Sequence, residues 1–340
     1  MSSNRLKIEW LTKSLAMKAY FDGDRTMQYT GGTLYEIDAI ETLSKNYDIS
    51  VNFNYIKTEN TLTYYFKRHK KFLNADICVT DPYVLAFNKL DYKRYNIAII
   101  HHIDEGLTKQ TKFGKYFLKQ LLKNLAKVDL VVVVSKYWEN YLASKEIQNI
   151  KIIYNSYHLE DFEVEDYKLA KLKKKLQLDS EKPTIYLGKL GKGKGVEKVL
   201  QYIDVSKYNL IATGKNKSTS DYYRTVFLPK EDFPALLKLA DVVLCMSTMP
   251  EGWNRVAHEA MLVKTPVIGS GSGGMKELLD NAGQSVITEF SQLESKIQKV
   301  IENKMELGNL AFDYVKQFNS EYFNSEWISI IKNAIQKVNR

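Results

Sequence analysis

Cysteine is scarce in this sequence, and long apolar runs are missing. Its 340 residues include only two cysteines, Cys78 and Cys245, and both lie within apolar, strand-like runs. We therefore expect two buried thiols rather than a disulfide or a metal-binding pair. No apolar run approaches the roughly 20 residues that cross a bilayer, and the opening MSSNRLKIEWL lacks the apolar stretch of a signal peptide. These features predict a cytoplasmic protein.

Proline and glycine are also few, at 6 and 17 residues, and neither low-complexity tracts nor a repeat of fixed period is visible. Together with 44% hydrophobic residues, this argues against disorder, solenoids and propellers. A chain of 340 residues is longer than one core usually supports, so two domains are expected. The net charge of +9 suits anionic partners such as nucleotides, phospholipids or nucleic acid.

Short apolar, β-rich runs alternate with longer helical patterns along the whole chain. This alternation predicts an α/β protein with two doubly wound parallel sheets, separated near the lysine-rich residues 164–183. About eleven strands are expected, at residues 6–11, 48–56, 75–80, 96–102, 129–135, 150–155, 183–188, 208–214, 223–229, 241–247 and 265–270.

Loops that directly follow the strands are where ligands bind in open α/β sheets. One of them, in YLGKLGKGKGVEKVL, has Gly188, Gly193 and Lys194 at the spacing of a P-loop. A P-loop needs Ser or Thr next, to hold Mg²⁺, but this chain has Gly195. The motif alone therefore leaves open an ATPase or another kind of phosphate site.

Several other motifs are weak. Gly269, Gly271 and Gly274 form a GxGxxG, but it follows the last expected strand, so backbone close to a ligand is favoured over NAD binding. Asp22 and Asp24 have the spacing of a metal site, yet carboxylates in a polar loop are usually solvated. His158 lies in a polar turn and is treated in the same way.

Residues 249–279 carry the most informative pattern. Glu251 follows a strand, a helix is expected to begin near Asn254 or Arg255, and Glu259 lies within it. A helix start attracts phosphate through its unpaired N–H groups and its dipole. Glutamates on either side can accept hydrogen bonds from sugar hydroxyls. The pattern favours a site for a phosphate linked to a sugar.

On these motifs the chain resembles the retaining glycosyltransferases of family 4 (glycosyl transferases group 1). The family signature of two spaced glutamates, a Pro-Val-Ile run and a glycine loop corresponds to Glu251, Glu259, residues 266–268, Gly273, Gly274 and Glu277. Upstream, Lys189 stands where the family has arginine, and Lys194 matches the family lysine. In the first half, the family landmarks correspond to Gly31, Gly32, His101 with its neighbour His102, Ser135, Asn155 and Phe162.

The resemblance implies a GT-B fold with two facing Rossmann-like domains. Residues 1–165 would form an acceptor-side domain, 166–320 a nucleotide-sugar-binding domain, and 321–340 a helix that packs back on the first domain. The implied activity is metal-independent transfer of a sugar, with retention, from a UDP- or GDP-sugar to the hydroxyl of a glycan, lipid-linked or protein acceptor. No cofactor is expected, because fixed cations and helix starts can neutralise the leaving diphosphate.

The same resemblance assigns roles to residues. Lys189, Lys194 and the amides from Gly252 to Arg255 would stabilise the leaving diphosphate, Glu259 would hold the ribose, Glu251 would orient the donor sugar, and His101 would support that sugar. The remaining positions expected to bind the donor are Gly31, Gly32, His102, Gly188, Gly214, Trp253, Asn254 and Val256. Departures from the family pattern are Lys189, the MSTMP before Glu251, Lys264-Thr265 before the Pro-Val, and a long first loop at 12–30.

Residues 107–127 hold six lysines and no acid, with the lysines on one helical face and Phe113, Phe117, Leu121 and Leu125 opposite. This indicates either a solvated face over a buried one, or docking on an anionic membrane surface, on the inner face of a membrane. A GT-B epimerase or hydrolase acting on a nucleotide sugar is the main alternative function. A nucleic-acid binder is disfavoured, because the lysines lack interleaved aromatic residues and no helix-turn-helix signature is present.

Overall fold

Two parallel six-stranded sheets form the framework of the protein in the residues that the computed structural model describes. Those residues are 6–24, 29–53, 75–87, 90–104, 106, 110–214 and 221–338. The chain divides into two compact units: unit 1 comprises residues 1–156 together with 321–340, and unit 2 comprises residues 157–320. The division falls between Ser156 and Tyr157, nine residues before the expected boundary at 165.

Unit 1 contains the first sheet, whose strands run in the order β2 (Asp48–Asn52), β1 (Lys7–Leu11), β3 (Ile77–Thr80), β4 (Tyr95–Ile100), β5 (Leu130–Val133) and β6 (Ile150–Ile152). Its described helices are α1 (Leu15–Phe21), α2 (Gly31–Ser44), α4 (Pro82–Phe87), α6 (Lys112–Leu125), α7 (Lys136–Ala143) and α15 (Ser320–Val338). The long first loop expected at 12–30 thus contains α1.

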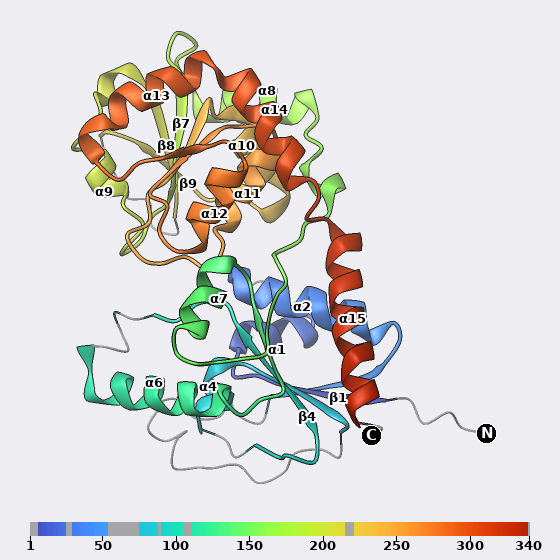
Figure 1. Cartoon of the computed structure of the whole chain (residues 1–340). Helices are drawn as coiled ribbons and strands as arrows, with labels where there is room; N and C mark the ends of the chain where they lie inside the picture. The colour runs from blue at the N-terminus through green and yellow to red at the C-terminus, as the bar shows by residue number, and fades with distance from the viewer. Residues whose placement is uncertain are drawn as a thin grey trace. The chain divides into compact units, whose positions relative to one another are not determined.

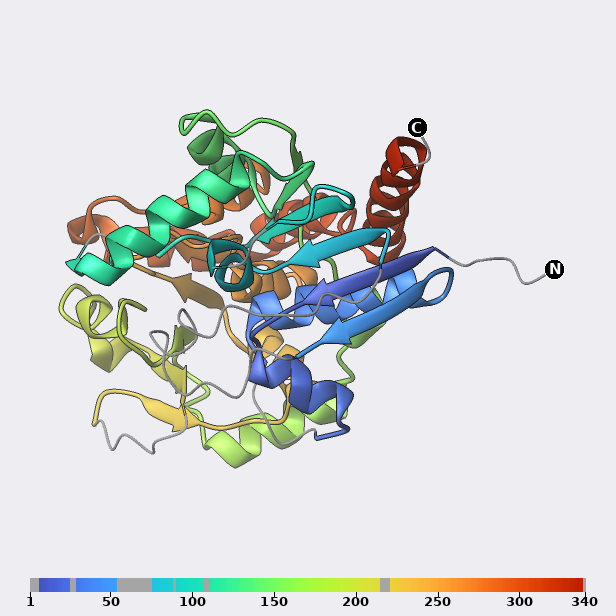
Figure 2. The same cartoon turned by 90° about the horizontal axis from the view of Figure 1, so that it is seen from below.

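Successive residues of each strand point to opposite faces of the first sheet. Both faces are buried, because helices cover each of them. Ile8, Trp10 and Ile97 pack with α2 and α15 on one face, whereas Cys78 and Ala98 pack with α4 and α6 on the other. Figures 1 and 2 show α15 and α6 on opposite sides of these strands. The C-terminal helix therefore belongs to the core of the unit in which the chain begins.

Helix α6 has the two faces that its sequence predicts. Phe117, Leu121 and Leu125 are buried in the core of unit 1. The lysines at 112, 115, 119, 123 and 127 are all exposed to solvent. The remaining lysine of the pattern, at 109, lies outside the described residues. The apolar face is thus occupied by packing, and the basic face is the part that solvent reaches.

Unit 2 contains the second sheet, in the order β12 (Ser285–Val286), β11 (Val267–Gly269), β10 (Val242–Cys245), β7 (Thr184–Lys189), β8 (Asn209–Thr213) and β9 (Arg224–Val226). Its described helices are α8 (Asp166–Leu176), α9 (Val196–Val199), α10 (Phe233–Leu239), α11 (Arg255–Leu262), α12 (Gly274–Asn281), α13 (Leu293–Glu302) and α14 (Lys304–Val315). Four 3₁₀ turns join them, η1 (Leu159–Phe162), η2 (Val205–Lys207), η3 (Lys230–Asp232) and η4 (Phe290–Gln292).

All eleven expected strands are present, and the doubly wound α/β fold is confirmed. Two details differ from expectation. The two-residue strand β12 was not predicted. The lysine-rich stretch 164–183 lies between the last strand of the first sheet and the first strand of the second, as expected, but it contains helix α8, whose Leu172 and Leu176 are buried. Among the described helices, none is both long and apolar enough to span a bilayer.

Candidate functional site

Three loops of unit 2 meet beyond the carboxyl ends of β7, β10 and β11, which are neighbours in the sheet. These loops cover residues 190–195, 246–254 and 270–273. The N–H of Thr248 donates to the carbonyl of Gly193 at 2.8 Å, and the N–H of Gly274 donates to the carbonyl of Glu251 at 2.9 Å. The loops are therefore tied together at the edge of the sheet where ligands bind in open α/β folds.

Gly195 stands where a P-loop has Ser or Thr. Its φ is +79°, and a Cβ placed there would lie 2.1 Å from the carbonyl oxygen of Met246. No side chain fits at that distance, so this position cannot supply a hydroxyl for Mg²⁺. The helix that follows, α9, has only four residues. The loop is therefore not a P-loop, although its spacing resembles one.

Lys194 and Glu251, two residues predicted for the site, form an ion pair. Lys194 Nζ donates to Oε1 of Glu251 at 2.7 Å. The two side chains are 39% and 20% exposed, so solvent reaches the pair. A phosphate bound to Lys194 would consequently also lie close to the carboxylate of Glu251.

Helix α11 begins at Arg255, as the sequence predicts. Asn254 is its N-cap, with φ +80°, and the Asn254 side chain accepts a hydrogen bond from the N–H of Ala257 at 2.9 Å. The other N–H groups of a first helical turn have no partner within the helix, and the helix dipole makes this end positive. The start of α11 therefore presents positive potential beside the loop that carries Glu251.

Glu259 lies one turn into α11 and is largely buried. Arg255 Nε is 3.5 Å from Oε1 of Glu259, and the Arg255 guanidinium also stacks over the ring of Tyr157, 4.5 Å from its centroid. Burial raises the pKa of Glu259, whereas Arg255 and Lys230 act in the opposite direction. In this structure the glutamate expected to hold the ribose is thus held by the arginine at the helix start.

Trp253 is buried, with 2% of its surface exposed. Its Nε1 donates to Nδ1 of His258 at 2.9 Å, and the His258 ring lies 4.2 Å from that of Tyr157. Burial is the main cause that lowers the pKa of His258, to about 3. Among the positions expected to bind the donor, Trp253 can therefore act only through its backbone. His258 was not predicted, since a single histidine in a helix gives no signal of this packing.

The other predicted positions of unit 2 surround these loops. Lys189 is exposed and ends β7, next to Gly188. Gly214 directly follows β8, and Gly252 and Val256 are partly buried on either side of the α11 start. Residues 215–217, which follow Gly214, lie outside the described residues.

The residues of unit 1 that were predicted to bind the donor lie at the start of α2 and directly after β4. Thr30 caps α2 through its side chain, Gly31 and Gly32 form the first turn, and His101 follows β4 directly. A Cβ on Gly32 would lie 2.8 Å from Cδ2 of the His101 ring. Gly32 thus allows the imidazole to lie against the helix backbone. The neighbouring His102 is exposed.

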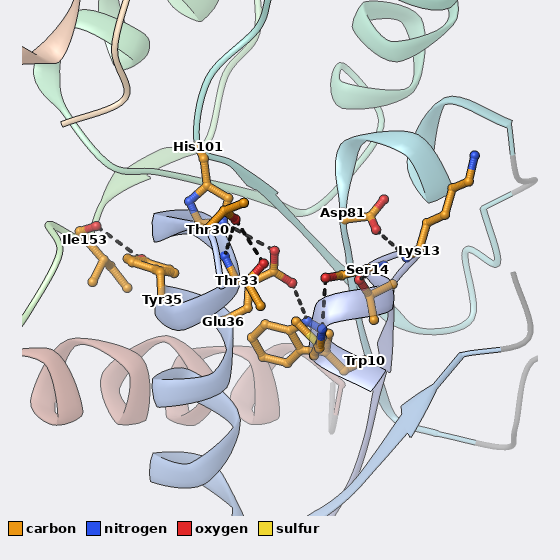
Figure 3. A network of polar contacts seen from close by, with 12 residues as sticks. Trp10, Lys13, Ser14, Thr30, Thr33, Tyr35, Glu36, Asp81, His101 and Ile153 are labelled. Carbon is orange, nitrogen blue, oxygen red and sulfur yellow. Dashed lines mark hydrogen bonds and ion pairs between the residues drawn. The ribbon is translucent and has the colours of Figure 1, made fainter. Parts of the chain in front are cut away.

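His101 belongs to a polar network that the sequence did not reveal, shown in Figure 3. Its Nε2 lies 3.3 Å from Oε1 of Glu36, and the other oxygen of Glu36 accepts a hydrogen bond from Nε1 of Trp10 at 2.9 Å. The Tyr35 ring packs edge-on against the imidazole, with the ring centroids 5.0 Å apart. Both Glu36 and Trp10 are buried.

Asp81, directly after β3, is a second buried carboxyl in this region. It accepts hydrogen bonds from the backbone N–H groups of Lys13 and Val84, each at 2.7 Å. Burial, with a smaller effect of the nearby Glu36, raises the pKa of Asp81 to about 6. Its hydrogen bonds join the loop after β1 to the start of α4.

The weak metal candidates do not form a site among the described residues. Asp22 pairs with Lys18, His158 Nδ1 lies 2.9 Å from the hydroxyl of Ser320, and the described part of the chain has no cluster of three metal-ligating side chains. Cys78 and Cys245 are free and buried, as expected. Burial raises the pKa of both thiols, that of Cys78 to about 12.

Comparison of sequences finds relatives among glycosyltransferases. Residues 169–316 match the family model of glycosyl transferases group 1. An uncharacterized glycosyltransferase of Methanocaldococcus jannaschii, MJ1178, is 26% identical over 255 residues, which are 70% of this chain and 67% of that protein. A 78-residue stretch is 33% identical to YtcC of Bacillus subtilis and covers 23% of this chain, but only 19% of YtcC. The chain thus spans a fifth of one curated relative and two thirds of the other.

Solved structures share the fold over nearly the whole chain. Sucrose-phosphate synthase from Thermosynechococcus elongatus superimposes with a TM-score of 0.76 at 17% identity, covering 98% of this chain and 100% of that one. HepE of Anabaena, in complex with UDP-glucose, gives 0.73 at 16% identity, covering 96% and 100%. WaaG, a glycosyltransferase involved in lipopolysaccharide biosynthesis, gives 0.72 at 12% identity, covering 95% and 99%. The chain therefore has the GT-B fold, and its residues 169–316 match the glycosyl transferases group 1 family.

Proposed function

We propose that this protein is a retaining glycosyltransferase of family 4 that moves a sugar from a nucleoside-diphosphate sugar to an acceptor hydroxyl. The observation that carries the proposal is the meeting of Lys194, Glu251 and the start of α11 on one surface of unit 2. A lysine and a helix start suit a diphosphate, and a partly exposed carboxylate beside them suits sugar hydroxyls. The family match of residues 169–316 supports the same reaction class.

The diphosphate leaves with negative charge, which the site must stabilise. We assign this to Lys189, Lys194 and the backbone N–H groups from Gly252 to Arg255. Charges fixed in place before the reaction need no reorganisation when the bond to the sugar breaks. Transfer without a bound metal follows from this assignment. Lys194→Ala should then mainly slow transfer.

The glutamates and His101 act on the sugar portions of the donor. Glu251 orients the transferred sugar, Glu259 holds the ribose hydroxyls, and His101 contacts the transferred sugar. For Glu259 this requires its pairing with Arg255 to leave one carboxylate oxygen for the ribose. Glu259→Ala should weaken nucleotide binding. Wild-type donor affinity in Glu259→Ala, with a wild-type rate in Lys194→Ala, would overturn these roles.

The function is tested by nucleotide release from a panel of UDP-, GDP-, ADP- and TDP-sugars, with ATP alongside, each with and without EDTA. Release from one nucleotide sugar that survives EDTA supports the proposal and names the donor. The anomeric configuration of the product, read by NMR, tests retention. Conversion of the donor without any acceptor would favour the epimerase or hydrolase, and hydrolysis of ATP that EDTA abolishes would contradict both.

The acceptor is proposed to be a glycan, a protein or a lipid-linked molecule, and the exposed lysines of α6 favour the last. Among the described residues, no ion pair joins those lysines to an acid. Each lysine near an anionic bilayer contributes about 1 kcal/mol to binding. Since the apolar face of α6 is buried, docking would be electrostatic.

Flotation on liposomes tests this docking. Binding should rise with the fraction of anionic lipid, fall at high salt, and weaken in a variant with Lys112, Lys115, Lys119 and Lys123 changed to Gln. A matched control changes the exposed Lys171, Lys173, Lys174 and Lys175 of α8 to Gln, which removes the same number of positive charges. Binding that does not depend on the fraction of anionic lipid would contradict docking through the lysines of α6. Stronger, salt-dependent binding to random DNA would instead revive a nucleic-acid partner.

A further inference from the structure

The side chain of Glu36 is placed to control the proton on His101. Glu36 lies in the second turn of α2, is buried, and has one partner on each carboxylate oxygen: Trp10 Nε1 at 2.9 Å on Oε2, and His101 Nε2 at 3.3 Å on Oε1. In Figure 3 the imidazole and the carboxylate point toward each other, with the Trp10 indole on the far side of the carboxylate.

The imidazole has little freedom to turn away. The ring lies against the backbone at Gly32, where even a Cβ would approach within 2.8 Å, and the edge of Tyr35 packs against it. Tyr35 is itself fixed by a hydrogen bond from its hydroxyl to the carbonyl of Ile153 at 3.1 Å. Helix α2 thus fixes both the ring plane and the nitrogen that faces Glu36.

A carboxylate accepts hydrogen bonds but does not donate them, so Nε2 must carry the proton of a neutral imidazole. The other nitrogen, Nδ1, is then an acceptor, because the tautomer of a histidine is set by the bond that one nitrogen makes. Among the residues that the structure describes, none hydrogen-bonds Nδ1. The His101 side chain is 17% exposed, which leaves its ring accessible to a ligand.

We propose that Glu36 is a positioning residue that holds His101 in the Nε2–H tautomer, so that Nδ1 accepts a hydrogen bond from a hydroxyl of the bound sugar. This rests on the proposed function, in which His101 contacts the transferred sugar. Trp10 also takes part, because its indole N–H can only donate. Any side chain at position 36 must therefore turn a hydrogen-bond acceptor toward Trp10.

Glu36→Gln tests this with almost no change in shape. Trp10 still needs an acceptor, so the amide oxygen of Gln must face Trp10 and its NH₂ must face His101. The NH₂ can only donate, which forces the proton of His101 from Nε2 to Nδ1. Nδ1 then no longer accepts a hydrogen bond. We expect kcat/KM for transfer to fall by about 10- to 100-fold, as when an orienting partner of a functional histidine is lost.

The double variant Trp10→Phe with Glu36→Gln separates an effect on the tautomer of His101 from an effect on the stability of the fold. Phenylalanine does not donate, so the amide can turn its oxygen to His101 and restore the Nε2–H tautomer. The double variant should therefore transfer sugar faster than Glu36→Gln, although loss of the indole makes it less stable. Glu41→Gln is the matched control, since Glu41 lies on the same helix but is exposed and bonded to Tyr20. A double variant no faster than Glu36→Gln would show that the role of Glu36 is only structural.

The tautomer itself can be read by ¹⁵N NMR of the ligand-free protein at a pH where the imidazole is neutral. The chain has five histidines, and His101→Gln identifies the signal of His101. We expect Nε2–H in the wild type, Nδ1–H in Glu36→Gln, and Nε2–H again in the double variant. Nδ1–H in the wild type, or the same tautomer in all three, would overturn the proposal. Because this reading needs no substrate, it decides the tautomer even if no nucleotide sugar is turned over.

Discussion

The ion pair of Lys194 and Glu251 places opposite charges where a diphosphate is expected to bind. The carboxylate oxygen is 2.7 Å from the ammonium nitrogen, so it weakens the positive potential that a phosphate would meet. Glu251→Gln should therefore tighten binding of a free nucleoside diphosphate by about 5-fold, which corresponds to roughly 1 kcal/mol. The same change should slow sugar transfer, because it alters the group proposed to orient the sugar.

Isothermal titration with UDP and GDP measures this effect. Glu197→Gln is the matched control, since it removes a negative charge three residues after Lys194 from an exposed side chain. Equal affinities in the wild type and in Glu251→Gln would show that the pair does not act on the diphosphate.

Asp81 should make the stability of unit 1 depend on pH. Its pKa is about 6 in the folded protein and near 3.8 in an unfolded chain, so the folded state holds the proton more tightly. The stabilisation of the folded state by this proton is fully present below about pH 4, and it is lost as the pH rises to about 6. Each pH unit between the two pKa values is worth about 1.4 kcal/mol, so the total is roughly 3 kcal/mol.

Urea unfolding of the wild type and of Asp81→Asn, at several pH values from 4 to 7, tests this effect. The variant is expected to be less stable overall, because an amide has one oxygen for the two N–H donors of Lys13 and Val84. The difference in unfolding free energy between wild type and variant should shrink from pH 4 to pH 6 and then stay constant. A difference that is independent of pH would mean that Asp81 is ionised throughout.

Helix α8 is an element that was not predicted from the sequence. The run DYKLAKLKKKL is rich in lysine, yet Leu172 and Leu176 lie four residues apart, face the same side and are buried. The helix packs against α10 of unit 2. Leu172→Ala should destabilise unit 2 by about 2 kcal/mol, at the lower end of core Leu→Ala changes because α8 lies at the periphery. Lys173→Ala, on the exposed side, should change the melting temperature little.

The strands were predictable because each is a nearly continuous apolar run, and the start of α11 was predictable because Asn254 follows a strand loop and precedes a helical pattern. Strand β12 was not predictable, since a strand of two residues is too short to show an alternating pattern. Glu36 was missed for a different reason. It lies inside helix α2, most of whose residues are buried, and only the fold brings it to Trp10 and His101, which are 26 and 65 residues away. Burial of Trp253 likewise depends on contacts between distant segments.

The chain as a whole is not two consecutive halves, because its last helix completes the first unit. Trp327 on α15 is fully buried, 5.7 Å from the ring of Trp10 and 6.2 Å from that of Tyr35. The core cluster that holds these residues takes five buried side chains from α15, and the cluster of buried residues from β7, β10 and α13 in unit 2 takes none. The two units should therefore respond differently to loss of the C-terminus.

Deletion of residues 321–340 should unfold unit 1 and leave unit 2 folded. Truncation of one buried tryptophan costs about 3–5 kcal/mol of stability. The free energy of unfolding of a whole domain is only about 5–15 kcal/mol, so the loss of every buried side chain of α15 should exceed it. In calorimetry the truncated chain should keep one transition, with a lower enthalpy than the full chain, and amide NMR signals of residues 157–320 should remain dispersed. Because Glu36, Trp10 and His101 are in unit 1 while Lys194 and Glu251 are in unit 2, the truncated protein should still bind a nucleoside diphosphate but transfer no sugar. Loss of binding together with transfer would mean that the nucleotide site depends on unit 1.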